Sequence, residues 1–250
     1  MHQGNGVRDR ALLVVIRDKT DSRGSTDRLD ELRRLAASAG VAVAQAVARE
    51  CRQYDPAFFI TAGKLAELKA LVQEHDAGVV IFDNELSPAQ QRNLEDELGI
   101  AVADRTGLIL DIFAQRARSR EGKLQVELAQ LNYLQPRLRG RGQALSRLGG
   151  GIGTRGPGET KLEVDRRKVR QRIQRLQHSL EQVTHTRKIQ RASRSRYGWY
   201  GAALVGYTNT GKSTLLNRLA GASVPAANRL FSTLDPTTRS VRLGGGSELL

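Results

Sequence analysis

The sequence predicts an α/β protein with three parts: a small parallel α/β domain at the N-terminus, an antiparallel helical hairpin, and the start of a P-loop domain. Three observations predict this. Strand-like and helix-like segments alternate through the first hundred residues. Leucines at helical spacing follow in residues 105–192, and the string Gly206-Tyr207-Thr208-Asn209-Thr210-Gly211-Lys212-Ser213 matches the phosphate-binding pattern G-x-x-x-x-G-K-S. We expect domains at residues 1–104, 105–192 and 201–250, with a linker at 193–200.

The first domain is predicted from short apolar runs that alternate with helical leucine spacing. The apolar runs predict strands at residues 11–16, 41–47, 78–82 and 100–102, and the leucine spacing predicts helices at 27–38 and 63–75. Ser87 followed by Pro88 is typical of a helix start, and Gly99 is typical of a helix end. This alternation favours a small parallel sheet covered by helices.

Three polar residues, Asp83, Asn84 and Glu85, follow the third expected strand. In α/β proteins functional groups often lie at this end of a strand. We interpret the three residues as the turn that leads into the Ser87 helix start, with a ligand-binding role as the alternative.

The middle of the chain predicts two long helices with narrow apolar stripes. The first stripe is Leu124, Leu128, Leu131, Leu134 and Leu138; the second is Leu162, Val169, Ile173, Leu176, Leu180 and Val183. Narrow stripes with charged flanks suit two antiparallel helices packed against each other, and two helices lying on the sheet domain are the alternative. Residues 139–160 between the helices are rich in Gly and Arg and predict a hairpin tip.

The positive charge of the chain is concentrated in this middle region. The net charge is +14, and residues 105–200 hold 22 Lys or Arg against 7 Asp or Glu. Such a concentration favours a polyanionic partner through counterion release, while a solvated Arg-rich helix is the alternative. The candidate RNA-binding residues at the tip are Arg139, Arg141, Arg147 and Arg155. In the following linker Tyr197, Trp199 and Tyr200 are expected to pack at the entrance of the P-loop domain, and base stacking is the alternative.

Composition argues against several classes of function. Cys51 is the only cysteine, which excludes a disulfide within the chain, and the four histidines have no zinc-ligand spacing. No apolar run approaches the roughly 18–20 residues that span a bilayer, and residues 1–6 show no signal-peptide pattern. The segment Gly151-x-Gly153-x-x-Gly156 matches a dinucleotide fingerprint, but an Arg-rich stretch precedes it in place of a strand, so we reject it.

The P-loop match predicts nucleotide binding. The run 202–205 before it is expected to be a short buried strand, and Thr214 to Leu219 after it a helix. Backbone N–H groups of residues 206–214 would cradle phosphate oxygens, Lys212 would contact the β- and γ-phosphates, and Ser213 would hold Mg²⁺. In the later segment 231–239 we expect Thr233, or as second choice Thr237, to sense Mg²⁺ and the γ-phosphate as part of a switch loop.

The nucleotide base is left open by these residues. No Asp-x-x-Gly or Asn-Lys-x-Asp segment follows the P-loop, so neither guanine selection nor a catalytic residue is identified, and an ATP-using enzyme is an alternative. We therefore expect the P-loop domain of this chain to be incomplete.

Five strings together resemble the HflX family of ribosome-associated GTPases. They are residues 104–114 (DRTGLILDIFA), 121–131 (EGKLQVELAQL), 149–160 (GGGIGTRGPGET), 204–209 (LVGYTN) and 231–237 (FSTLDPT). The resemblance covers nearly the whole chain after about residue 10. It departs from the family at Thr61-Ala62-Gly63-Lys64, where Gly-x-Gly-Lys is more usual, and at Tyr197 to Tyr200.

This resemblance implies a GTP-binding and GTP-hydrolysing factor of the cytoplasm that uses Mg²⁺. It implies binding to the 50S subunit and the 70S ribosome, with the tip reaching ribosomal RNA, and splitting of stalled ribosomes. Asn209 matches, more weakly, a K⁺-binding residue of related GTPases. We expect a monomer. The alternative is a passive RNA- or ribosome-binding module whose P-loop domain does not function.

Overall fold

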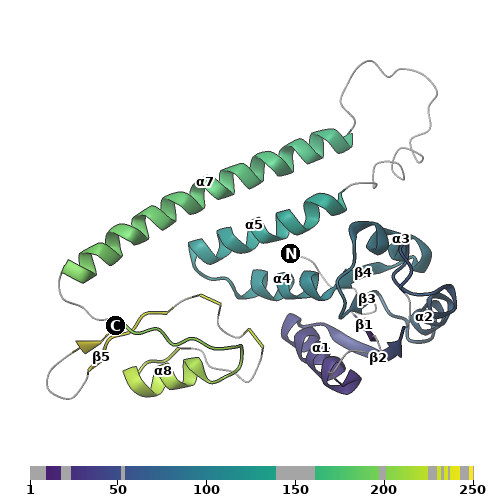
Figure 1. Cartoon of the computed structure of the whole chain (residues 1–250), viewed down its shortest axis with the longest axis horizontal. Helices are drawn as coiled ribbons and strands as arrows, with labels where there is room; N and C mark the ends of the chain where they lie inside the picture. Colours follow the sequence, from purple (N-terminus) through teal and green to yellow (C-terminus); the bar gives the residue numbers. More distant parts are fainter. Residues whose placement is uncertain are drawn as a thin grey trace. The chain divides into compact units, whose positions relative to one another are not determined.

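The computed structural model describes residues 10–17, 24–51, 54–138, 161–196, 201–224, 230–231, 234–235, 237–242 and 248–249. The chain forms two compact units (Figure 1). One comprises Met1–Ile112 and Gln130–Val169, and the other comprises Phe113–Ala129 and Arg170–Leu250. Three helices supply residues to both units: α4 (Arg105–Arg116), α5 (Arg120–Arg137) and α7 (Lys161–Arg196).

The first unit contains a four-stranded parallel sheet with the order β2-β1-β3-β4. Its strands are β1 (Arg10–Arg17), β2 (Ala42–Glu50), β3 (Val79–Phe82) and β4 (Ala101–Asp104). The helices that connect them are α1 (Ser25–Ala39), α2 (Ala62–Glu74) and α3 (Pro88–Leu98). The predicted alternation and the parallel sheet are confirmed.

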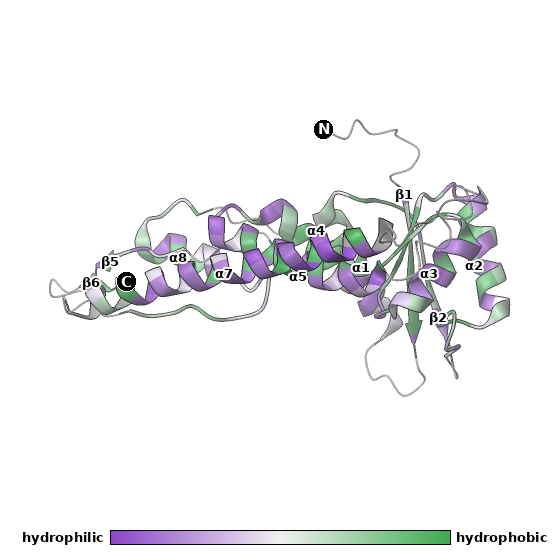
Figure 2. Cartoon of the chain, turned by 90° about the horizontal axis from the view of Figure 1, so that it is seen from above, coloured by the Kyte–Doolittle hydropathy of each residue, from purple (hydrophilic) through white to green (hydrophobic). Residues whose placement is uncertain are grey.

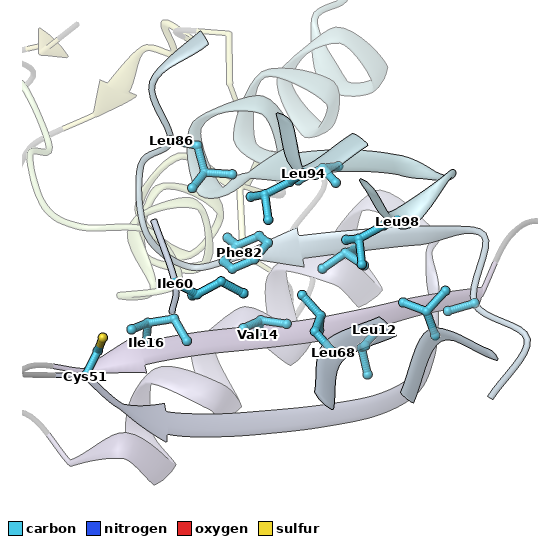
Figure 3. Close-up of a cluster of buried hydrophobic side chains, with 14 residues drawn as sticks. Leu12, Val14, Ile16, Cys51, Ile60, Leu68, Phe82, Leu86, Leu94 and Leu98 are labelled. Carbon is cyan, nitrogen blue, oxygen red and sulfur yellow. The ribbon is translucent and has the colours of Figure 1, made fainter. Parts of the chain in front are cut away.

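The central strand β1 is buried on both faces, which explains why its sequence is continuously apolar. Leu12, Val14 and Ile16 belong to the main hydrophobic cluster together with side chains of β3, α2 and α3, as Figure 3 shows. The intervening Leu13 and Val15 are fully buried as well, and by strand alternation they point to the opposite face. That face is where α1 lies against β1 and β2.

Local signals fix the ends of α3. The Ser87 side chain accepts a hydrogen bond from the Gln90 amide, and the Gln90 side chain accepts one from the Ser87 amide, which completes a capping box. Gly99 ends the helix in a left-handed conformation with φ +71°. Both predicted helix boundaries are confirmed.

α4 was not distinguished from the first arm of the hairpin in the sequence, although it is a separate helix. Asp104, the last residue of β4, accepts a hydrogen bond from the Gly107 amide at 2.8 Å and so caps α4. Leu108 and Ile112, four residues apart, form its buried face. The spacing was visible in the sequence, but the break at Ala117 and Arg118 carries no Gly or Pro to signal it.

The predicted antiparallel hairpin is confirmed by two ion pairs in the second unit. Arg172 pairs with Glu127, and Arg187, further along α7, pairs with Glu121, earlier on α5, so the helices run in opposite directions. Ile173 and Leu176 on α7 are buried as predicted. Figure 2 shows hydrophobic residues concentrated in the sheet strands, whereas α7 is largely hydrophilic.

The predicted stripe on α5 is partly wrong. Leu134 is 47% exposed, while Val126, which lies outside the stripe, is only 6% exposed. Leucine spacing alone does not fix which face of a helix is covered, because burial depends on what packs against it.

The remaining elements of the second unit are α8 (Lys212–Ala220), β5 (Val241–Arg242) and β6 (Glu248–Leu249). The two short strands pair antiparallel. Among the described residues, no helix has the length and apolar character needed to cross a membrane.

Candidate functional site

The loop before α8 has the backbone geometry of a phosphate-binding loop. Asn209 has φ +58° and Gly211 has φ +83°, so two left-handed residues turn the chain sharply into the helix. The first N–H groups of a helix lack intrahelical partners and carry its positive dipole end. A loop of this kind, placed directly before a helix, presents N–H donors to an anion.

Gly206 allows the loop to close on itself. A Cβ atom at this position would lie 3.1 Å from the Thr210 hydroxyl and 3.7 Å from the Lys212 side chain. The Thr210 hydroxyl in turn donates a hydrogen bond to the Tyr207 carbonyl at 2.8 Å. A side chain at this first glycine of the pattern would therefore crowd the Thr210 hydroxyl within the loop.

The Lys212 side chain is hydrogen-bonded to the loop that precedes it. Its ammonium group donates to the Tyr207 carbonyl and lies 3.5 Å from the Thr210 hydroxyl, and it forms no ion pair with any described carboxylate. Ser213, the next residue of α8, is half-buried. Mg²⁺ bound to a nucleotide takes most of its ligands from phosphates and water and needs only one or two from the protein. The Ser213 hydroxyl can supply one such ligand, so the residues present fit a magnesium-nucleotide.

The predicted strand at residues 202–205 is not formed. Residues 201–207 have no regular structure, and the side chain of Val205 is 91% exposed. The run is apolar, as a buried strand requires, but within the described part of the chain no strand pairs with it. A four-residue strand is not stable without hydrogen-bonded neighbours.

The segment after α8 is tied back to the helix by a residue that the sequence did not single out. The Asn217 side chain donates to the Val224 carbonyl and accepts from the Val224 amide, both at 2.8 Å. Gly221, with φ +58°, ends the helix between them. This pair of bonds fixes the exit of the chain from α8.

The predicted switch loop is described only in part. Thr233, the first choice for the Mg²⁺-sensing residue, lies outside the described residues, while Thr237 is described and half-buried. Asp235, also in this loop, accepts hydrogen bonds from the backbone amides of Arg118 and Ser119. Sequence reasoning missed this contact because the partners are 116 or more residues apart.

The candidate arginines of the hairpin tip, Arg139, Arg141, Arg147 and Arg155, lie outside the described residues, as do Tyr197, Trp199 and Tyr200. The described basic surface is on α7, which holds 12 Lys or Arg against 3 Asp or Glu. Lys168, Arg170, Arg175 and Lys188 are exposed and form no ion pair with another described residue.

The polar residues after β3 have contacts within the first unit. Asp83, buried, accepts hydrogen bonds from Arg28 and Arg105, both at 2.7 Å. The Asn84 side chain bonds to both the amide and the carbonyl of Ile16 and thereby extends the pairing of β3 with β1. This arrangement favours the turn interpretation over a ligand site.

Comparison with known proteins matches the three predicted parts of the chain to GTPase families. Three family models match: GTP-binding GTPase N-terminal at residues 26–114, GTP-binding GTPase Middle Region at 116–194, and 50S ribosome-binding GTPase at 201–250. The GTPase HflX of Caldanaerobacter subterraneus subsp. tengcongensis is 51% identical over 97% of this chain and 56% of its own length. The GTPase HflX of Escherichia coli is 50% identical over 93% of this chain and 54% of its own length.

A solved structure, that of SsGBP in complex with GDP, is 26% identical with a TM-score of 0.54 over 88% of this chain and 59% of that chain. The chain thus spans a little over half the length of the curated relatives that it matches.

Proposed function

Since the chain belongs to the HflX family of GTPases, we propose that it is a GTP-controlled factor that binds the 50S subunit of the ribosome. The observation that carries this proposal is the loop before α8, in which the left-handed Asn209 and Gly211 precede a helix that starts at Lys212. The N–H groups of residues 206–214 hold the phosphates, Lys212 neutralises the β- and γ-phosphates, and Ser213 binds Mg²⁺. The preference for GTP over ATP rests on the relatives' names.

Mg²⁺, when bound, neutralises charge on the phosphates. The protein's own part is to orient them, through backbone donors that a fixed loop supplies without reorganisation. By family resemblance the nucleotide is hydrolysed and acts as the switch, and K⁺ binds beside Asn209.

The ribosome as partner is supported by the basic surface. The exposed Lys168, Arg170, Arg175 and Lys188 on α7 suit the phosphates of ribosomal RNA. In this proposal the tip arginines Arg139, Arg141, Arg147 and Arg155 reach further into the RNA, and the factor, a cytoplasmic monomer, splits stalled 70S ribosomes.

The test is cosedimentation of the chain with 50S subunits across a salt series, with and without GTP or ATP. Replacing Arg170, Arg175 and Lys188 by Ala should weaken binding and reduce the slope of log affinity against log salt by about one per lost phosphate contact. A triple variant of Arg33 and Arg34, exposed on α1, and Lys69, half-buried on α2, loses the same charge and should leave the slope unchanged.

Equal effects of the two triple variants would mean that binding follows net charge alone. Removing Arg139, Arg141 and Arg155 tests the tip in the same assay, and an unchanged salt slope would refute its role.

A second candidate is a passive ribosome- or RNA-binding module, and the unpaired, exposed segment 201–207 favours it. In that case 50S binding would be specific but indifferent to GTP, and the loop before α8 would bind no nucleotide. ATP competing as well as GTP would instead favour an ATP-using enzyme.

A further inference from the structure

The loop that follows α8 is attached to the corner between α4 and α5, within the second unit. The Asp235 carboxylate accepts hydrogen bonds from the backbone amides of Arg118 and Ser119, each at 2.8 Å, and from the Ser119 hydroxyl. The Ser119 hydroxyl oxygen accepts from the Gly122 amide at 2.9 Å, so Ser119 is the N-cap of α5. Asp235 therefore holds the cap residue from outside the helix.

The carboxylate fits this place closely. A Cβ atom at Gly122 would lie 2.3 Å from one Asp235 oxygen and 3.0 Å from the Ser119 hydroxyl. Any other residue at 122 would displace one of these groups. A negative charge at the N-terminus of a helix is also favoured by the helix dipole.

A second contact holds the same loop, at a residue whose backbone is strained. The Phe231 ring meets the Phe113 ring edge to face, with centroids 4.9 Å apart. Phe231 has φ +54°, a backbone conformation that aromatic residues rarely adopt. Strained residues of this kind persist only where surrounding contacts hold them, and they often lie in switch segments. The attached position of the loop is thus one that can be released.

We propose that Asp235 is a nucleotide-sensitive cap of α5. Thr237 is two residues from Asp235, and two residues span at most about 7 Å of extended chain. A magnesium-nucleotide that engages the loop at Thr237 therefore pulls on the Asp235 carboxylate that holds Ser119. The contact of Asp235 with α5 and the binding of nucleotide thus compete for the same short loop. Nucleotide in the phosphate site therefore loosens the start of α5, the helix that leads to the hairpin tip. This inference rests on the proposed function, because it needs nucleotide at the loop before α8.

Hydrogen–deuterium exchange of the chain with Mg²⁺ and GTPγS tests it. Nucleotide should slow exchange at residues 206–214 and speed it at the amides of 118 and 119. Asp235→Ala and Gly122→Ala should exchange fast at 118 and 119 whether or not nucleotide is present. By reciprocity of coupled equilibria, both should bind nucleotide about threefold to tenfold more tightly.

Gly63→Ala is the matched control for Gly122→Ala, since a Cβ at Gly63 would meet no atom within 4 Å. Slower exchange at 206–214 without change at 118 and 119, or weaker nucleotide binding by the two variants, would overturn the competition. No change in either segment would overturn the nucleotide site itself, and the proposed cap with it.

Discussion

The carboxyl edge of the sheet and the loop before α8 are both places where α/β proteins bind ligands, but they use their charges differently. At the sheet edge Asp83 is held by Arg28 and Arg105, and Asp104 accepts bonds from Arg137 and a tyrosine hydroxyl. Both carboxylates are buried, and their charges are balanced within the unit.

At the loop before α8 the charged group, the ammonium of Lys212, has only neutral partners. Lys212 bonds to a backbone carbonyl, and no described carboxylate pairs with it. A buried charge with a built-in partner indicates a structural role, whereas a charge with neutral partners can still bind an anion. The location in the fold alone does not distinguish the two regions, whereas the partners of the charged groups do.

Asp104→Ala gives the largest expected effect on stability. The Asp104 side chain is 1% exposed, and its loss would leave the Tyr133 hydroxyl and the Gly107 amide without this acceptor and Arg137 without its carboxylate partner. We expect the free energy of unfolding to fall by about 3–5 kcal/mol, measured by urea denaturation. Asp30→Ala, at an exposed ion pair, should change it by no more than about 0.5 kcal/mol. Similar small effects of both would show that the sheet edge is not structural.

Lys212→Ala should weaken nucleotide binding without lowering the stability of the fold. Loss of two charge-assisted hydrogen bonds to phosphates lowers nucleotide affinity about a hundredfold, measured by titration with labelled GTP. The free energy of unfolding should change little, because Lys212, the first residue of α8, is not fully buried and forms no ion pair with a described residue. Lys69→Ala, which removes a lysine paired with Glu97, is the control. Unchanged affinity in Lys212→Ala would refute the assignment of the loop.

Gly107→Ala tests the close packing beneath Asp104. A Cβ atom there would lie 2.9 Å from the Tyr133 hydroxyl and 3.5 Å from an Asp104 oxygen. Displacing that hydroxyl should lower the free energy of unfolding by about 1–3 kcal/mol in thermal or urea denaturation. Gly63→Ala, in open space, should cause no loss. Equal stability of the two variants would mean that the tyrosine moves aside freely.

The sequence was informative wherever a signal is local. The capping box of Ser87 and the left-handed Gly99 act within a few residues, and both were predicted correctly. The apolar run of β1 was recognised because burial on both faces leaves no polar position. The P-loop was found by its spacing, and its left-handed residues agree with the pattern.

The sequence was uninformative wherever the partner is distant. The strand order β2-β1-β3-β4, the burial of Val126 in place of Leu134, and the bonds of Asp235 to α5 all depend on residues far along the chain. The run 202–205 shows the same limit, because an apolar segment becomes a strand only beside another strand. The domain boundaries predicted from composition stay a prediction.

The smallest expected effect is the response to acid of the Asp235 contact at the start of α5. Burial acts to raise the pKa of Asp235, but the Ser119 hydroxyl, the two amides and the charge of Arg118 outweigh it and lower the pKa below its usual value. A carboxyl group whose pKa is lowered by folding adds stability above its unfolded pKa, about 3.9, and loses it as pH falls through the folded pKa. Amide protection at residues 118 and 119 should therefore be constant from pH 7 to about 5 and decline only below about pH 4. In Asp235→Asn, where the group does not titrate, protection should be weaker and independent of pH over this range, as hydrogen exchange corrected for intrinsic rates would show. A decline already near pH 6 would mean that another group, and not this carboxylate, holds the start of α5.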